Sequence, residues 1–292
     1  MLMNEIYSFT KMKVIANTNS ISVFALACVL LFSPTDLLAQ NDIRTQSFPK
    51  EEVAVTKIPK RKNVWVFILA GQSNMAGRGL VEPQDTIPSE RILSINKSGK
   101  VIIAKEPLHF YESTLTGLDC GLSFGKEIVK EAPVKISVLL IPAAVGGSSI
   151  SQWLGDSTHR NVKLLSNFKE RVALGKKYGK IKGILWHQGE SDTNPNDAPH
   201  YSERLEQLFK IFRVAAGDEN LPILIGELGG YSDNKIWTVV NEQIRRYSSI
   251  DKNTAVISTS ELKDKGDKLH FNSEGQRILG QRFAEAYLKM KK

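Results

Sequence analysis

The sequence predicts an α/β protein in which helices cover both faces of a parallel sheet. Short apolar runs, rich in Val, Ile and Leu, recur along the chain, and segments of helical periodicity lie between them. Strands that are buried on both faces have this continuous apolar character, and strands that alternate with helices form parallel sheets. The composition, 41% hydrophobic and 24% charged, excludes a disordered or collagen-like chain.

Residues 1–39 are expected to be a cleaved signal peptide. A segment with two lysines precedes the apolar run 21–32, and Ala39 offers a small residue for cleavage. The run is shorter than the roughly 20 residues of a membrane-spanning helix, so we expect no stable membrane insertion after processing. The mature protein is then secreted or periplasmic. Lipid attachment at Cys28 is the alternative, and the position of Cys28 inside the apolar run disfavours it.

Residues 40–62 are polar, contain two prolines and end in a basic cluster, which indicates a linker or N-terminal arm. The remaining segment, 63–292, is expected to be one domain. The formal net charge of +8 is spread along the chain rather than gathered in one block, so we expect no nucleic-acid partner. The chain has only two cysteines, Cys28 and Cys120, which excludes a disulfide-stapled fold.

Five apolar runs are the expected strands of the parallel sheet. They are Val64–Ala70, Ile136–Ile141, Ile181–Trp186, Leu221–Ile225 and Ala255–Ser258. Two shorter runs, Ile92–Ile95 and Val101–Ala104, flank a turn-rich segment and predict an inserted hairpin.

Two segments show the apolar face of an amphipathic helix. In 201–212 and 278–287, large apolar residues recur three and four positions apart. Ser273 and Gln276 have the spacing of a capping box, which predicts the start of the last helix.

Polar clusters follow four of the five expected strands. They are Gly71–Gly77 after the first strand, 143–149 after the second, His187–Asp192 after the third and, somewhat later, Asp267–Phe271 after the fifth. Ligands bind beyond the carboxyl ends of the strands in sheets of this kind. We therefore expect the four clusters to converge on one rim.

Ser73 directly follows the first expected strand, beside glycines that permit a tight turn. A serine hydroxyl needs a base to act as a nucleophile, and His270 is the candidate. Asp267 precedes this histidine by three residues and can orient its imidazole from the same loop. These three residues predict the catalytic triad of a serine hydrolase.

The tetrahedral intermediate of acyl transfer needs hydrogen-bond donors for its oxyanion. We expect three: the backbone N–H of Ser73, a backbone N–H at Gly146 or Gly147, and the side-chain amide of Gln188. The sequence leaves open which of the two glycines donates.

The segment around His187 allows other interpretations. A metal site lacks support, because only Glu190 stands at ligand spacing beside this histidine. We expect a structural histidine there, with Glu190 and Asp192 as acceptors that brace the loop, and we expect no metal. The rival hypothesis is that His187 or Glu190 is the catalytic base. Trp153 is expected in the core, with a place in a sugar site as its alternative.

In this order the motifs resemble the SGNH hydrolase superfamily and, more closely, the group of carbohydrate esterase family 6 and sialate O-acetylesterases. The resemblance covers about residues 64–287. It rests on G-Q-S-N-M-A-G at Gly71–Gly77, A-V-G-G-S-S-I at Ala144–Ile150, W-H-Q-G-E-S-D at Trp186–Asp192 and D-x-L-H-F at Asp267–Phe271. It implies a three-layer α/β/α flavodoxin-like fold with a five-stranded parallel sheet.

The resemblance also implies a reaction, the removal of an acetyl group from a carbohydrate hydroxyl without a metal or organic cofactor. It places Ser73 as the nucleophile, His270 as the base and Asp267 as its orienting acid. The expected protein is a secreted serine esterase that deacetylates acetylxylan or a related plant polysaccharide through an acetyl-enzyme. A sialate O-acetylesterase is one alternative. A catalytically inactive carbohydrate-binding protein is the other, and the intact Gln188 and triad argue against it.

Overall fold

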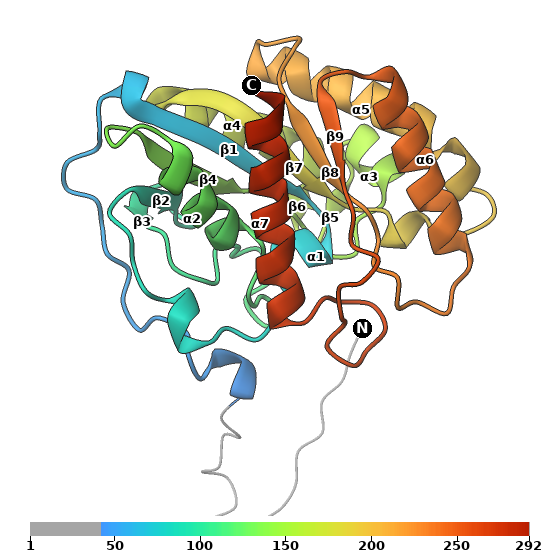
Figure 1. The fold of residues 1–292 in the computed structure, drawn as a ribbon, viewed down its shortest axis with the longest axis horizontal. Coiled ribbons are helices and arrows are strands. Elements are labelled where there is room, and N and C mark those ends of the chain that lie inside the picture. Colours follow the sequence, from blue (N-terminus) through green and yellow to red (C-terminus); the bar gives the residue numbers. More distant parts are fainter. Residues whose placement is uncertain (1–41, 292) are drawn as a thin grey trace, which may run out of the picture. The chain divides into compact units, whose positions relative to one another are not determined.

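The computed structural model describes residues 42–291, and the predicted signal peptide lies outside them. A seven-stranded sheet crosses the domain in the order β3-β2-β4-β1-β7-β8-β9 (Figure 1). Its strands are β1 (Val64–Gly71), β2 (Ile92–Ile95), β3 (Val101–Ile103), β4 (Ser137–Pro142), β7 (Lys180–His187), β8 (Ile223–Gly226) and β9 (Thr254–Ile257). All neighbouring strands are parallel except β2 and β3, which are antiparallel.

The prediction of a parallel sheet is confirmed, but the prediction of five strands was wrong. The five apolar runs correspond to β1, β4, β7, β8 and β9. The predicted hairpin is present as β2 and β3, and it joins the sheet because β2 pairs in parallel with β4, from Ile92 opposite Val138 to Ser94 opposite Leu140. The hairpin therefore extends the sheet by two strands.

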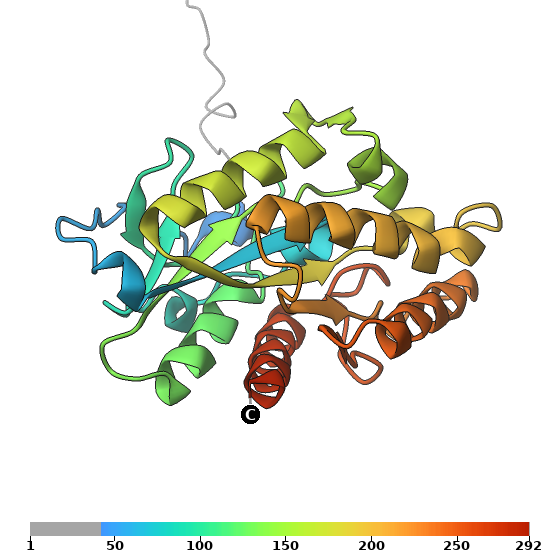
Figure 2. The same ribbon diagram turned by 90° about the horizontal axis from the view of Figure 1, so that it is seen from above.

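Helices cover both faces of the sheet, so the predicted three layers are confirmed. Figure 2 shows α4 and α5 above the sheet and α2 and α7 below it. The helices are α1 (Ser73–Ala76), α2 (Gly121–Glu131), α3 (Ile150–Leu154), α4 (Leu164–Tyr178), α5 (Tyr201–Ala216), α6 (Ile236–Ile250) and α7 (Ser273–Met290). A separate ribbon, β5 (Thr158–His159) and β6 (Val162–Lys163), lies outside the main sheet.

Strand β1 is buried on both faces, as its continuous apolar sequence predicts. Val66 and Ile68 belong to the core under α4 and α5, whereas Phe67 belongs to the core under α2 and α7. The Phe67 ring meets Phe124 of α2 and Tyr287 of α7 edge-on, with centroids 4.7 and 4.9 Å apart. Edge-to-face contacts of this kind stabilise a core beyond the area they bury.

Trp153 lies in the core, as expected, and its alternative place in a sugar site was wrong. Its side chain is fully buried and packs edge-on against Trp186 at 5.3 Å. Its indole N–H donates to Ser148 Oγ at 2.9 Å. The indole thereby fixes the base of the loop that follows β4.

The predicted capping box at α7 was also wrong. Asn272 is the N-cap, and its side chain accepts from Gly275 N at 2.7 Å. Gln276 turns away from the cap and donates from Nε2 to Asn74 O at 2.9 Å. The first turn of α7 is therefore tied to the segment that follows β1.

The arm that precedes β1 lies along the outer edge of the sheet. Val55 N donates to Val101 O, and Ile103 N donates to Val53 O, at 3.1 and 2.9 Å. This pairing covers the β3 edge, which would otherwise expose free backbone groups. The predicted division at residue 62 stays a prediction.

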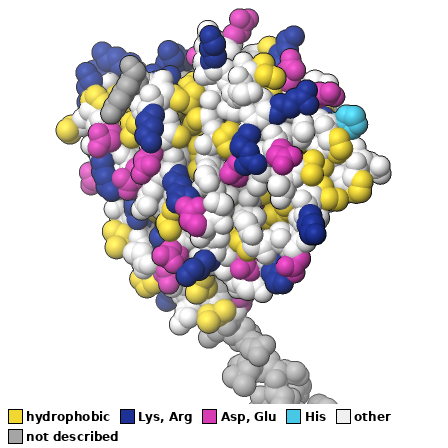
Figure 3. All heavy atoms as spheres, turned by 45° about the vertical axis from the view of Figure 1, so that its right-hand side comes forward, with side chains coloured by type: hydrophobic (Ala, Val, Ile, Leu, Met, Phe, Trp, Pro, Cys, Tyr) yellow, Lys and Arg dark blue, Asp and Glu magenta, His cyan; other side chains and the backbone are white. Residues whose placement is uncertain are grey.

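The described surface carries mixed charge. On the face in Figure 3, Lys and Arg side chains are interspersed with Asp and Glu. Within residues 42–291, no helix is both long enough and apolar enough to span a membrane.

Candidate active site

The four predicted polar clusters come together at the carboxyl ends of the strands. Strand β1 ends beside α1, below the middle of Figure 1, and the loop from β9 to α7 descends to the same edge. Gly71, the last residue of β1, has φ +136°, and an added Cβ there would lie 2.0 Å from His187 O at the end of β7. Only glycine permits this close approach. It brings the loops after β1 and β7 side by side.

The predicted triad residues lie within hydrogen-bond distance of one another. His270 Nε2 is 3.0 Å from Ser73 Oγ, and His270 Nδ1 is 2.8 Å from Asp267 Oδ2. Ser73 opens α1 and is largely buried, whereas the imidazole is 15% exposed. With Asp267 accepting a hydrogen bond from the Nδ1–H group, Nε2 is left unprotonated and can accept the serine proton.

The loop itself fixes the Asp267 carboxylate. Its Oδ1 accepts from Leu269 N at 3.0 Å and from His270 N at 2.8 Å. Partial burial acts to raise the pKa of Asp267, but the hydrogen bonds from the His270 side chain and from these two amides outweigh it and lower the pKa. Asp267 is therefore an ionised partner for the imidazole at neutral pH.

The side chain of Asn74, the residue after Ser73, makes hydrogen bonds to the backbone on both sides of His270. Its Oδ1 accepts from Phe271 N at 3.0 Å, and its Nδ2 donates to Leu269 O at 3.1 Å. The same Nδ2 donates to Glu190 Oε1 at 2.6 Å. The amide thus holds the backbone before and after His270 while Glu190 holds the amide.

The rival bases, His187 and Glu190, contact partners other than Ser73. His187 is fully buried, and its Nε2 lies 2.9 Å from Glu227 O. Burial lowers the pKa of His187, although the nearby Glu190 acts in the opposite direction. Glu190 accepts from Asn74, and Asp192 Oδ2 accepts from Ile150 N at 3.0 Å, so their prediction as bracing acceptors is confirmed. Of the candidate bases, His270 is the one with a hydrogen bond to Ser73.

Two backbone N–H groups at the rim are free to bind an oxyanion. Within residues 42–291, neither Ser73 N nor Gly147 N donates to a protein acceptor. The N–H of Gly146 is taken, because it donates to Glu112 Oε2 at 2.7 Å. Of the two glycines that the sequence left open, Gly147 is therefore the available donor.

The side chain of Gln188 is buried and engaged with the protein. Its Nε2 lies near three acceptors, at 2.6 Å from Asp192 Oδ2 and 3.0 Å from both Gln72 Oε1 and Ser148 O. Its Oε1 accepts from Tyr201 O–H at 2.9 Å. This arrangement leaves no amide hydrogen for the predicted contact with the oxyanion. Gln188 instead joins the loops after β1, β4 and β7.

An ion-pair cluster around the buried carboxylate of Glu112 supports the loop after β4. Arg78 Nη2 lies 3.0 and 2.9 Å from the two carboxylate oxygens of Glu112, and Arg160 Nη1 lies 2.9 Å from Glu112 Oε1. Burial acts to raise the pKa of Glu112, but Arg78 and the Gly146 amide outweigh it and lower the pKa. Sequence reasoning missed this cluster, because its members come from three separate segments.

Tyr231 is a second residue of the rim that sequence reasoning missed. Its O–H donates to Leu269 O at 3.2 Å, and its ring meets Phe271 edge-on at 5.6 Å. It follows Gly229 and Gly230 in the loop after β8, the one strand end left without a predicted polar cluster. Its position in the loop after an expected strand was the sequence signal that could have identified Tyr231 as a rim residue.

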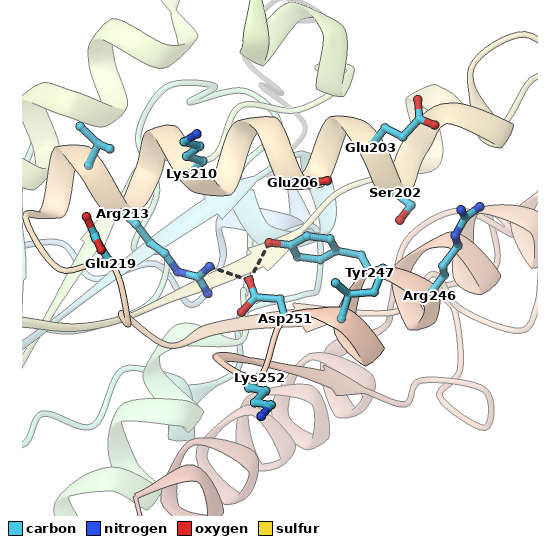
Figure 4. Close-up of a pocket in the computed structure, with 12 residues that line it drawn as sticks. Ser202, Glu203, Glu206, Lys210, Arg213, Glu219, Arg246, Tyr247, Asp251 and Lys252 are labelled. Atoms are coloured by element: carbon cyan, nitrogen blue, oxygen red, sulfur yellow. Dashed lines mark hydrogen bonds and ion pairs between the residues drawn. The ribbon is translucent and has the colours of Figure 1, made fainter.

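Away from this rim, the described residues form a cavity but no group of metal ligands. Within residues 42–291, no three His, Cys, Asp or Glu side chains are placed to hold a metal ion. A cavity of about 600 Å³ between α5 and α6 contains an internally paired network (Figure 4). There, Asp251 Oδ2 accepts from Arg213 Nη1 at 2.5 Å and from Tyr247 O–H at 2.6 Å.

The sequence is similar to those of known proteins. Residues 63–289 match the family described as carbohydrate esterase, sialic acid-specific acetylesterase. A probable carbohydrate esterase of Arabidopsis thaliana is 32% identical over 244 residues, which are 76% of this chain and 90% of the plant protein.

Solved structures share the fold. A structure of an Arabidopsis thaliana protein has a TM-score of 0.69 at 29% identity, covering 78% of this chain and 98% of that one. NanS has a TM-score of 0.65 at 18% identity, covering 80% and 99%. A carbohydrate acetylesterase from Xanthomonas citri has a TM-score of 0.57 at 18% identity, covering 77% and 55%.

The family assignment rests on the sequence match. The two structures at 18% identity support the fold alone. The resemblance to SGNH-type carbohydrate acetylesterases is thereby confirmed. With its match over residues 63–289, the chain belongs to the sialic acid-specific acetylesterase family of carbohydrate esterases.

Proposed function

We propose that the protein is a secreted serine O-acetylesterase that removes acetyl groups from carbohydrate hydroxyls through an acetyl-enzyme on Ser73. The family supports the reaction class. The hydrogen-bond chain from Ser73 through His270 to Asp267 is the single observation that supports the serine mechanism. Secretion rests on the predicted signal peptide in residues 1–39.

In the first half-reaction, Ser73 Oγ attacks the carbonyl carbon of the acetyl group while its proton passes to His270 Nε2. The oxyanion of the tetrahedral intermediate accepts from the N–H groups of Ser73 and Gly147. The bond between the carbonyl carbon and the sugar oxygen then breaks, and Nε2 returns the proton to that oxygen. Asp267 stabilises the transient imidazolium.

In the second half-reaction, water takes the place of the sugar. His270 Nε2 removes a proton from the water as its oxygen attacks the acetyl carbon. The intermediate collapses with release of acetate, and Nε2 returns the proton to Ser73 Oγ. The chemistry needs no group beyond those of the chain.

Acetylxylan or a related plant polysaccharide is the proposed substrate, in line with the plant origin of the similar esterase. Sialic acid O-acetyl esters are the second candidate, and the description of the matching family favours them. Acetate release from acetylated xylan, acetylated pectin and O-acetylated sialic acid, measured side by side, ranks the candidates.

Ser73→Ala is expected to abolish hydrolysis of p-nitrophenyl acetate and to leave the circular dichroism spectrum unchanged. The substitution removes the attacking oxygen and little volume. A serine-directed phosphonate should label Ser73 in the wild type, as read by peptide mapping. Ser191→Ala is the control, because Ser191 lies in the adjacent loop and should keep activity. Full activity in Ser73→Ala would refute the assignment, and an inactive wild type would favour a binding protein.

Asp267→Asn should lower kcat/KM on p-nitrophenyl acetate by several orders of magnitude, at most about 10⁴-fold, because a neutral amide can neither fix the imidazole tautomer nor stabilise the imidazolium. The lowered pKa of Asp267 keeps its carboxylate ionised at neutral pH, so protonation of Asp267 should reduce wild-type activity only at acidic pH. A pH–rate profile of the wild type checks this, and loss of activity through Asp267 near neutral pH would contradict it. Near-wild-type turnover by His270→Ala would contradict this mechanism.

Asn74→Ala should lower kcat on p-nitrophenyl acetate by about a hundredfold, the scale expected for a catalytic group misplaced by about 1 Å. The substitution frees the backbone on both sides of His270. KM for this small ester should change little, since Asn74 is buried behind the triad. Asn74→Asp is the matched variant: it can still accept from Phe271 N, but it faces Glu190 with like charge. Unchanged kcat in both variants would show that Asn74 does not position His270.

A further inference from the structure

A groove of about 790 Å³ lies between the β5–β6 hairpin, the first half of α4 and the segment containing Phe110 and Tyr111. We call it the hairpin groove. Its volume falls within the roughly 300–1,000 Å³ of small-molecule sites. None of the triad residues lines it.

The hairpin groove adjoins the catalytic rim through Arg160. This residue lines the groove and pairs with Glu112, which in turn accepts from Gly146 N. The neighbouring His159 Nε2 lies 2.9 Å from Gly146 O. A Cβ added at Gly147 would lie 3.8 Å from Arg160 Nη2. The guanidinium therefore stands between the groove and the proposed oxyanion donor.

Positive charge dominates the lining of the groove. Four cations line it, and Glu170 is the only carboxylate among the lining residues. The cations are Lys97, Arg160, Lys163 and Arg171. Among the described residues, only Arg160 of these four has a close ion pair, because it shares Glu112 with Arg78. Lys163 lies a distant 3.9 Å from Asp156. Such a lining favours an anionic ligand.

The groove also contains a fixed aromatic surface. Arg171 lies over the rings of Phe110 and Tyr111, at 5.5 and 5.8 Å from their centroids. Asn167 Oδ1 holds both ends of this arrangement, accepting from Tyr111 O–H at 3.0 Å and from Arg171 Nε at 3.3 Å. Half-buried aromatic rings beside guanidinium groups suit a ligand with apolar ring faces and carboxylates, which describes an acidic sugar.

We propose that the hairpin groove binds a carboxylate-bearing sugar unit that neighbours the acetylated unit held at Ser73. The substrate is then an acidic oligosaccharide rather than a single sugar. The proposal rests on the proposed esterase function. Arg160 would contact the sugar unit nearest the reacting ester. Lys97 and Arg171 would contact a unit further along the oligosaccharide.

Binding of unreactive probes to the wild-type protein tests the groove directly, by calorimetry. The probes are an oligogalacturonate and a sialyl-oligosaccharide, with a neutral xylo-oligosaccharide as reference. At least one acidic probe should bind about tenfold more tightly than the neutral one, the scale of one charge-assisted hydrogen bond. Its affinity should fall with added salt. Which acidic probe binds more tightly distinguishes a uronate from a sialate.

Charge-removing variants locate the binding. Lys97→Gln and Arg171→Gln should each lower the affinity for the acidic probe by about fivefold to tenfold and leave the affinity for the neutral probe unchanged. Lys97 is exposed, so its variant should fold normally. Arg246→Gln is the matched control, because it removes one exposed charge from α6 beside the cavity of Figure 4. Its affinity should equal that of the wild type.

Hydrolysis of p-nitrophenyl acetate separates the two proposals. If the wild type and both groove variants hydrolyse it equally, the esterase function stands independently of the groove. Equal affinity for acidic and neutral probes, or an equal loss in Arg246→Gln, would then overturn the groove proposal alone. Tight acidic binding by a protein that cannot hydrolyse the ester would overturn the esterase function and keep the groove as a binding site.

Discussion

The hydrogen bond between Ser73 and His270 is the interaction on which the site depends, and it joins residues 197 positions apart. Ser73, the proposed nucleophile, follows β1 near the centre of the sheet, whereas His270, the proposed base, precedes α7, beyond β9 at the sheet's edge. Two strands, β7 and β8, lie between them. The histidine loop must therefore reach back across the carboxyl ends of these strands.

Asn74 and Gln276 hold the histidine loop in this position by hydrogen bonds. Asn74 binds the backbone on both sides of His270, and Gln276 ties the first turn of α7 to the carbonyl of Asn74. Both side chains are buried, where an unpaired amide would be costly, so each contact is strongly favoured over its absence. His270, the proposed proton acceptor, is thus held by the segment that carries Ser73, the proposed nucleophile.

A second hydrogen-bond network, centred on Gln188, joins the loops after β1, β4 and β7. Its amide joins Gln72, Ser148 and Asp192, and Tyr201 donates to its oxygen. Burial raises the pKa of Asp192, although the hydrogen bond from Gln188 acts against the shift. A buried hydrogen-bond network of this kind favours one arrangement of the loops. It keeps Ser73 and the Gly147 loop together while leaving both N–H groups open.

The sequence predicted the parts that depend on residue type and chain position. The strands of the sheet centre were visible as apolar runs because they are buried on both faces, and the triad was visible because Ser73 and Asp267–His270 follow strands. The β2–β3 hairpin was predicted too, but the pairing of β2 with β4 was not, since a short apolar run does not determine which strand it pairs with.

What remained hidden depends on contacts between distant segments. The amide of Gln188 suggested an oxyanion donor, yet the acceptors that occupy it come from three separate places. Arg160 was invisible as a rim residue, because its place depends on the left-handed turn at Arg160 and Asn161, with φ of +47° and +63°. Asparagine is a residue type that often adopts this conformation, but arginine is not.

The central claim is that the acetyl group passes through Ser73, and trapping the intermediate tests it most directly. Wild-type protein mixed with an acetyl ester and quenched in acid after a few milliseconds, then digested and analysed by mass spectrometry, should carry one acetyl group on the peptide with Ser73. The same peptide from unmixed protein should carry none. An acetyl group on another residue, or turnover with no acetylated peptide at any quench time, would contradict the account.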